Sequence, residues 1–296
     1  MTALPPGGTG PAGDGTRASR PGAGPATGVP GGRASVVARA LIRTEPGHRG
    51  GTRMETLRSD PPLTLRQTGP ERIHLVSTGA GPLGGDRLAL GIDVAAGTSL
   101  EISSVGATLV LPGSAPGHSL MLVHARVGAG ASLRFSPEPT VLAAGCSHRV
   151  VVRLWLDEGA TAFWREEIVF GRHGERPGRC HTRFDASVAG RPLLRQDLVV
   201  GDPALDGSPA VYGEARCLGS TLVAGPQWDA LAVPDGKRER RARTGEGWAA
   251  LPLAGAGVLA TALAGDAVEL RRRLERGEEA ALGFAEPPTS IRPASQ

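Results

Sequence analysis

Aromatic residues and lysine are both scarce in this chain of 296 residues. Aromatics make up 3% of the sequence, as 4 Trp, 5 Phe and 1 Tyr, and Lys237 is the only lysine. Proteins that act on carbohydrate commonly stack aromatic rings on sugars, so this scarcity argues against that class. Hydrophobic residues still reach 40%, which is enough for a sizeable core built from Val, Leu, Ile and Ala.

Cysteine is rare as well, and its spacing excludes common cysteine-based sites. The 3 cysteines, Cys146, Cys180 and Cys217, lie far apart and none belongs to a C-x-x-C pair. This spacing excludes a zinc knuckle or a redox couple of that kind. An odd number of separated cysteines fits a reducing compartment.

The sequence also lacks a long apolar run. Its longest stretch free of Asp, Glu, Lys, Arg and His contains Trp248 to Gly265, is interrupted by Pro252 and is shorter than the ~20 apolar residues of a membrane helix, so we interpret it as core. No basic segment followed by an apolar one opens the sequence. We therefore predict a cytoplasmic protein without membrane association.

Motifs for nucleotide hydrolysis and for several hydrolase classes are absent. There is no G-x-x-x-x-G-K-[ST], H-E-x-x-H or G-x-S-x-G, and the 7 histidines occur singly. The net charge is +4, and the basic run from Lys237 to Arg243 lacks interleaved aromatics. We interpret that run as a solvated loop and predict no nucleic-acid partner.

A glycine-rich stretch after residue 78 resembles a dinucleotide-binding fingerprint but precedes the wrong element. Gly79, Gly81 and Gly84 have the G-x-G-x-x-G spacing, whose phosphate site needs a helix to open at the third glycine. Residues 88–94 instead alternate apolar and small or polar side chains, which predicts a strand. The stretch is therefore a glycine-rich turn that presents one carboxylate, Asp86.

The rest of the chain predicts one mainly β domain with two loose ends. Residues 1–33 are a Gly/Pro-rich leader that we expect to be disordered, residues 34–283 form the β domain, and residues 284–296 form a flexible tail. Strand, glycine turn and strand recur around Gly97, Gly130 and Gly159. These repeats favour stacked β-hairpins of a β-helix-like fold, with a sandwich left open.

Helical signals are confined to the region towards the C-terminus, where we expect one or two short helices. Asp266 is a candidate N-cap with Glu269 three residues later, so we expect a helix over residues 267–276 that Gly277 ends.

A second turn, Gly171 to Gly178, carries charged residues between two predicted strands. It contains Arg172 and Glu175, and His173 and His181 bracket its acidic and basic part. An exposed salt bridge would contribute little to stability. The alternative is that these charges face a groove or channel, and the spacing leaves both interpretations open.

Four segments together resemble the urease accessory protein family UreD, also called UreH. They are Leu83–Leu88 with its G-G-D, Ser103–Thr108, Phe135–Thr140, and Gly171–Glu175 with its G-R-x-G-E, in the order of that family. The resemblance covers about residues 35 to 280. The chain departs from the family pattern at Ser103-Ser104-Val105 and at Leu109.

The resemblance implies a non-enzymatic, mainly β maturation factor that binds apo-urease on one side and UreF on the other, with UreF recruiting the GTPase UreG. It implies no tightly bound cofactor and a transient path for Ni²⁺, along which Asp86 and Glu175 would offer weak, exchangeable oxygen ligands. Arg172 would position Glu175 or contact a partner. Gly84, Gly85 and Gly174 would shape the loops. An exposed partner surface would make the isolated chain prone to aggregate.

Two other functions stay open from the residues alone. Asp86 and Glu175 are candidates for the acid and base of a carbohydrate-active enzyme of the β-helix kind, because glycosidic chemistry needs two carboxylates. The other open function is that of a generic β-rich interaction scaffold unrelated to urease.

Overall fold

The computed structural model describes residues 35–48, 50–114, 117–231 and 241–285. All of them belong to the unit Gly32–Gln296. The predicted leader, residues 286–296 of the predicted tail and residues 237–240 of the basic run therefore lie outside the described residues.

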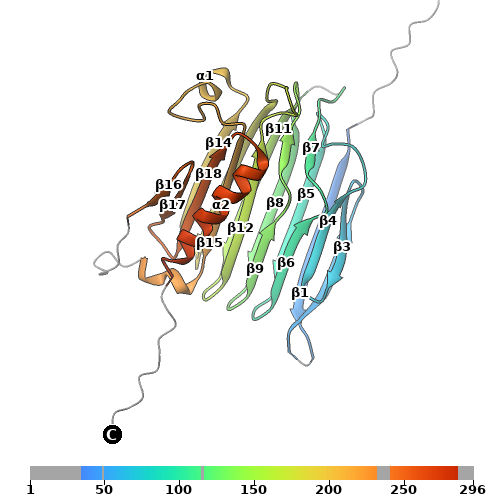
Figure 1. The fold of residues 1–296 in the computed structure, drawn as a ribbon. Helices are drawn as coiled ribbons and strands as arrows, with labels where there is room; N and C mark the ends of the chain where they lie inside the picture. Colours follow the sequence, from blue (N-terminus) through green and yellow to red (C-terminus); the bar gives the residue numbers. More distant parts are fainter. Residues whose placement is uncertain (1–34, 49, 115–116, 232–240, 286–296) are drawn as a thin grey trace, which may run out of the picture. The chain divides into compact units, whose positions relative to one another are not determined.

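Two β-sheets face one another and form the body of the described unit (Figure 1). The seven-stranded sheet has the order β14 (Arg191–Val200), β13 (Arg179–Val188), β11 (Ser147–Leu156), β8 (Ser119–Val127), β5 (Arg87–Val94), β1 (Val37–Pro46) and β2 (Thr52–Ser59). The eleven-stranded sheet has the order β16 (Arg243–Gly245), β17 (Trp248–Pro252), β18 (Gly257–Ala264), β15 (Cys217–Ala224), β12 (Thr161–Val169), β9 (Ser132–Ser136), β6 (Ser99–Ser104), β4 (Arg72–Ser77) and β3 (Leu63–Gly69), with β7 (Thr108–Val110) and β10 (Thr140–Leu142) joined beside β12.

Successive coils of the chain build the centre of both sheets. Each coil contributes one strand to either sheet, as β5 and β6, β8 and β9, or β11 and β12, and equivalent strands of neighbouring coils pair in parallel. The turns at Gly97, Gly130 and Gly159 have φ of 70°, 63° and 71°, a left-handed conformation that glycine adopts without strain. The prediction of a mainly β fold with stacked repeats is thus confirmed.

The repeats differ from hairpins in one respect. The two strands joined by each of these glycine turns lie in opposite sheets and pair with the neighbouring coils instead of with each other. Alternation of apolar residues does not distinguish the two arrangements, because both bury every second side chain. The repeating unit is therefore a coil of a β-solenoid.

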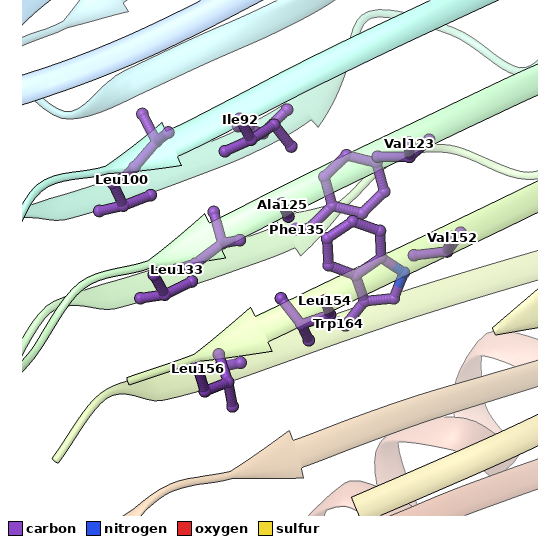
Figure 2. Packing of buried hydrophobic residues seen from close by; sticks show 14 of the residues in the cluster. Ile92, Leu100, Val123, Ala125, Leu133, Phe135, Val152, Leu154, Leu156 and Trp164 are labelled. Carbon is purple, nitrogen blue, oxygen red and sulfur yellow. The ribbon is translucent and has the colours of Figure 1, made fainter. Parts of the chain in front are cut away.

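Inward side chains from both sheets fill the space between them (Figure 2). The layers repeat from coil to coil, as Leu100 of β6 and Leu133 of β9, which are in register, illustrate (Figure 2). Trp164 of β12 stacks on Phe135 of β9, with ring centroids 4.0 Å apart and an interplanar angle of 16°. This pair supplies a large part of the aromatic contact in a core that is otherwise aliphatic.

Helix α2 (Ala267–Leu282) covers the outer side of the eleven-stranded sheet over β15, β17 and β18 (Figure 1). Asp266 caps it as predicted, accepting from the backbone N–H of Glu269 at 2.8 Å. The prediction that Gly277 ends the helix is wrong. Gly277 is buried where α2 lies close to the sheet, and a Cβ there would approach the Ala260 Cβ to 3.3 Å, so the glycine permits helix–sheet contact.

Two shorter helical segments complete the described chain, α1 (Pro203–Asp206) and the 3₁₀ segment η1 (Pro226–Leu231). Trp228 of η1 donates its indole N–H to the Ala281 carbonyl of α2 at 3.1 Å. Phe284 packs in the same apolar cluster, so the packed part of the chain extends beyond α2. The predicted core stretch 248–265 forms β17 and β18. None of the described helices has the length and apolar character needed to cross a membrane.

Candidate functional site

Asp86 closes the glycine-rich turn and directly precedes β5. Its side chain is 1% exposed. Oδ1 accepts the backbone N–H of Val36 at 2.8 Å, and Oδ2 accepts that of Leu83 at 2.9 Å. The Asp86 carbonyl accepts from the Leu120 N–H at 2.8 Å. Asp86 therefore joins the approach to β1, the glycine turn and the start of β8.

The glycines beside Asp86 permit close approach of the backbone. Gly85 has φ of 87°, which disfavours any side chain. Gly84 lies against Gly113, where a Cβ would come within 2.6 Å of the Gly84 backbone nitrogen. Glycine is thus favoured at Gly85 by its backbone conformation and at Gly113 by its close approach to Gly84.

Glu175 lies in the loop between β12 and β13, as the sequence predicts for its turn. Arg172 donates to its Oε1 from Nε at 2.8 Å and from Nη2 at 2.5 Å. Oε2 accepts the backbone N–H groups of Ala144 at 3.2 Å and Arg172 at 3.3 Å. The Arg172 hydrogen bond and these backbone donors lower the pKa of Glu175 to about 2. Gly174, with φ of 74°, completes the turn.

The structure places Asp86 and Glu175 at the same end of the stack but in separate networks. Each precedes a strand of the parallel set β5, β8, β11 and β13. Two strands lie between β5 and β13, so the starts of those strands are about 14 Å apart by the usual strand spacing. His173 and His181 flank the Glu175 loop, and His181 Nε2 lies 3.0 Å from Asp197 Oδ1 of β14.

A cavity of about 170 Å³ lies between the two sheets near this end of the stack. Its wall is mostly apolar and includes Gly81 and Pro82 of the glycine-rich turn. Three titratable residues that the sequence reasoning missed, His148, Glu166 and Glu167, also line it. The sequence of β12 does contain a signal. Glu166 is two residues from both Trp164 and Ile168, so it lies on the same, inward face of the strand.

Glu166 is the carboxyl group that faces the interior. Burial raises its pKa from 4.5 to about 7, an effect that the neighbouring Trp164 indole opposes only in part. The indole N–H forms no hydrogen bond of ordinary geometry among the described residues. Near neutral pH, Glu166 therefore exchanges between a neutral acid and a carboxylate.

Glu167, the next residue, points towards α2. Its side chain is 0% exposed, and its Oε1 lies 2.8 Å from Arg271 Nε. Burial raises the pKa of Glu167, and the Arg271 guanidinium opposes that rise. Arg271 also reaches Glu138, with Nη2 3.5 Å from Oε2. Adjacent glutamates thus have different environments on the two sides of one strand.

His148 and two buried thiols near the cavity are uncharged at neutral pH. His148 Nδ1 lies 2.8 Å from the Ser119 hydroxyl oxygen, and burial lowers the pKa of His148 to about 4. Burial raises the pKa of the free Cys146 thiol to about 11 and that of Cys180 to about 12. Across the described part of the chain, no three or more His, Cys, Asp or Glu residues are grouped so as to hold a metal ion.

The family model described as UreD urease accessory protein matches residues 37–292. This chain belongs to the UreD urease accessory protein family. The match spans both predicted turns and all the cavity residues named above, and it confirms the resemblance inferred from the G-G-D and G-R-x-G-E segments.

Individual UreD proteins are similar to this chain over most of its length. The urease accessory protein UreD of Frankia casuarinae is 45% identical over 289 residues, covering 83% of this chain and 90% of the relative. UreD of Streptomyces avermitilis is 42% identical over 249 residues, covering 82% of this chain and 96% of the relative. Membership of an accessory family supports a role in urease maturation and favours a non-catalytic protein over a carbohydrate-active enzyme.

Proposed function

We propose that this UreD-family chain is a cytoplasmic scaffold that links apo-urease to UreF and, through UreF, to the GTPase UreG, and that it assists delivery of nickel to urease. Family membership supports the maturation role. The observation that carries the nickel part is the Glu166 carboxyl group, which lines the cavity between the sheets and has no ion-pair partner among the described residues.

The chemistry of Glu166 suits a cargo ion that must be released. A carboxylate is an oxygen ligand that binds Ni²⁺ less tightly than imidazole or thiolate sites do. Because the pKa of Glu166 is about 7, a proton competes with the ion at neutral pH. Single carboxylates in a largely apolar cavity therefore favour brief contact over storage.

Asp86 and Glu175 remain proposed contributors to the same path. Both Asp86 oxygens already accept backbone N–H groups, so ligation would compete with contacts that hold the turn. Gly81 and Pro82 line the cavity, which makes shaping of its wall the role of Asp86 that its contacts support. Glu175 and Arg172 would similarly order their loop for a partner.

Co-purification tests the scaffold. The tagged full chain is co-expressed with UreF, UreG and apo-urease from the same source, and urease activity is measured with and without the chain at limiting nickel. Capture of the partners together with dependence of activity on the chain is the expected result. Absence of capture with undiminished activity would overturn the proposal.

Substitutions separate the nickel path from the scaffold. Glu166→Gln is expected to retain capture of the partners and to lower urease activation at limiting nickel, with recovery at excess nickel. Glu158→Gln, in an exposed turn, is the matched control. Asp86→Ala and Glu175→Ala belong in the same assay. Full activation by all three variants at limiting nickel would remove the conduit role and leave the scaffold intact.

A further inference from the structure

The described helices and strands leave the outer side of the seven-stranded sheet uncovered. Helix α2 packs on the other sheet, and no described helix or strand packs over the outward side chains of β1, β5, β8, β11 and β13. Those side chains are exposed or half-buried, in alternation with buried inward ones. We call this surface the arginine face.

Positive charge dominates the arginine face. Its five central strands direct eight arginines outward: Arg39, Arg43, Arg87, Arg126, Arg149, Arg153, Arg179 and Arg183. They direct three acidic residues outward: Glu45, Asp93 and Asp185. The flanking strands β2 and β14 add Arg53, Arg58, Arg195 and Asp197.

Most of these arginines lack an ion pair within the described ranges. Arg43 lies 3.9 Å from Asp93, and Arg183 binds Asp185 at 3.0 Å. For Arg126, Arg149 and Arg153, no carboxylate of a described residue lies within 4.0 Å. Mutual repulsion among these exposed guanidinium groups would be relieved by a negatively charged partner.

A small apolar strip crosses the middle of the same face. Leu122 of β8 is in register with Ala89 of β5 and Val151 of β11, and all three are half-buried. Trp155, 38% exposed, packs edge-on against His124 at 5.7 Å between ring centroids. Apolar residues framed by arginine, with an accessible Trp, are the composition of protein interfaces and their energetic hot spots.

We propose that the arginine face docks an acidic surface of a folded protein partner in the maturation complex, with Trp155 as an apolar anchor. This inference rests on the proposed function for the identity of the complex, and on charge complementarity for the choice of partner. The apolar strip would form the water-excluding centre of the interface with the partner. The surrounding arginines accelerate association and fix orientation.

The same observations disfavour other occupants. A second copy of this chain docking through the same face would bring arginines against arginines, because an isologous contact joins identical surfaces. A nucleic acid would use the charges but not the aliphatic strip, and single-strand binding draws on several stacking aromatics where this face offers one tryptophan and one exposed histidine.

The test measures binding of the purified full chain to purified apo-urease and to purified UreF, separately, at low and high salt. Arg149→Glu/Arg153→Glu reverses the centre of the face. Arg272→Glu/Arg276→Glu on exposed positions of α2 makes the same change in net charge on the other side of the molecule. Arg149→Gln/Arg153→Gln and Trp155→Ala are milder variants, and thermal unfolding of each variant checks that it is folded.

We expect the Arg149/Arg153 reversal to weaken binding to one of the two proteins by about tenfold or more. The glutamine pair and Trp155→Ala should weaken the same interaction less, and the α2 control should retain it. Retention of both interactions by all variants, or equal loss in the α2 control, would overturn the inference while leaving the proposed function standing. If the wild-type chain bound neither protein, the proposed function would fail and this inference with it. Arginine-dependent binding of a DNA duplex, with protein binding unchanged, would also overturn it.

Discussion

The two outer faces of the solenoid use the same residue, arginine, in opposite circumstances. Beneath α2, Arg165 of β12 is 9% exposed in its side chain, and it donates to Glu278 from Nε at 2.8 Å and from Nη2 at 2.5 Å. On the arginine face, Arg149 and Arg153 project into solvent without a carboxylate within ion-pair distance among the described residues.

The difference teaches where charge contributes to the fold and where it is free for binding. A buried pair forms at the cost of desolvating both ions, so removal of one partner leaves the other uncompensated. An exposed arginine keeps its hydration, and its loss changes stability little. Substitutions beneath α2 should therefore affect mainly the stability of the fold. Substitutions on the arginine face, which we also call the bare face, should affect mainly binding.

The largest effect is expected at Glu278, which Arg165 and the Thr221 hydroxyl both contact, the latter at 2.6 Å. Glu278→Ala should lower the free energy of unfolding by about 3–5 kcal/mol, because it leaves a buried guanidinium unpaired. Urea denaturation of the purified chain measures this. The double variant Arg165→Met/Glu278→Leu should recover much of the loss. A change below about 1 kcal/mol in the single variant would contradict the contrast between the faces.

Glu166 extends the comparison, because its carboxyl group lines the cavity between the sheets and forms no ion pair with a described residue. Its pKa of about 7 in the folded chain exceeds the ordinary 4.5, so the unfolded chain loses the proton first as the pH rises. Its contribution to stability is thus full below pH 4.5 and is lost between pH 4.5 and 7, by up to about 3 kcal/mol. Glu166→Gln should remove this fall in urea denaturation across that pH range, whereas Glu158→Gln should not. Parallel pH curves for Glu166→Gln and the wild-type chain would show that Glu166 is not desolvated.

The sequence predicted the repeats well because their signals are local. Glycine at Gly97, Gly130 and Gly159 marks a left-handed turn, and alternation around it marks strands, whatever those strands pair with. Pairing between coils depends on contacts distant in sequence, so the sequence pattern of a stacked hairpin is the same as that of a solenoid coil. Gly277 was misread for a related reason, because a glycine that lets a helix approach a sheet has the same local signature as one that ends a helix.

The candidate site was predictable only in part. Asp86 and Glu175 stand out because they lie in glycine-rich turns. Glu166 is inconspicuous in a strand with neighbouring charges, and only the alternation with Trp164 indicates that it points inward. Its raised pKa arises from burial, which depends on segments distant in sequence that no local pattern describes.

On the bare face, neutralising charge should hardly affect folding. Arg149→Gln/Arg153→Gln is expected to change the free energy of unfolding by less than about 0.5 kcal/mol, because neither side chain forms an ion pair with a described residue. A small gain would reflect reduced repulsion between like charges. The same denaturation assay used for Glu278→Ala makes the comparison direct. A loss above about 2 kcal/mol would mean that these arginines stabilise the sheet, and the contrast between the faces would break.

The smallest effect on folding is expected in the Glu175 loop, where the pair with Arg172 is exposed. Since the pKa of Glu175 is lowered to about 2, its contribution is present above pH 4.5 and is lost as the pH falls towards 2. Arg172→Gln should raise the pKa of Glu175 towards 4.5 with little change in stability at neutral pH, as an NMR titration of ¹³C-labelled glutamate would show. Glu158, in its exposed turn, provides the reference resonance. If the pKa stayed near 2 in the variant, the backbone N–H groups of Ala144 and residue 172 would hold the carboxylate without the guanidinium. The loop would then be ordered by its backbone, and Arg172 would be free, like the arginines of the bare face, to contact a partner.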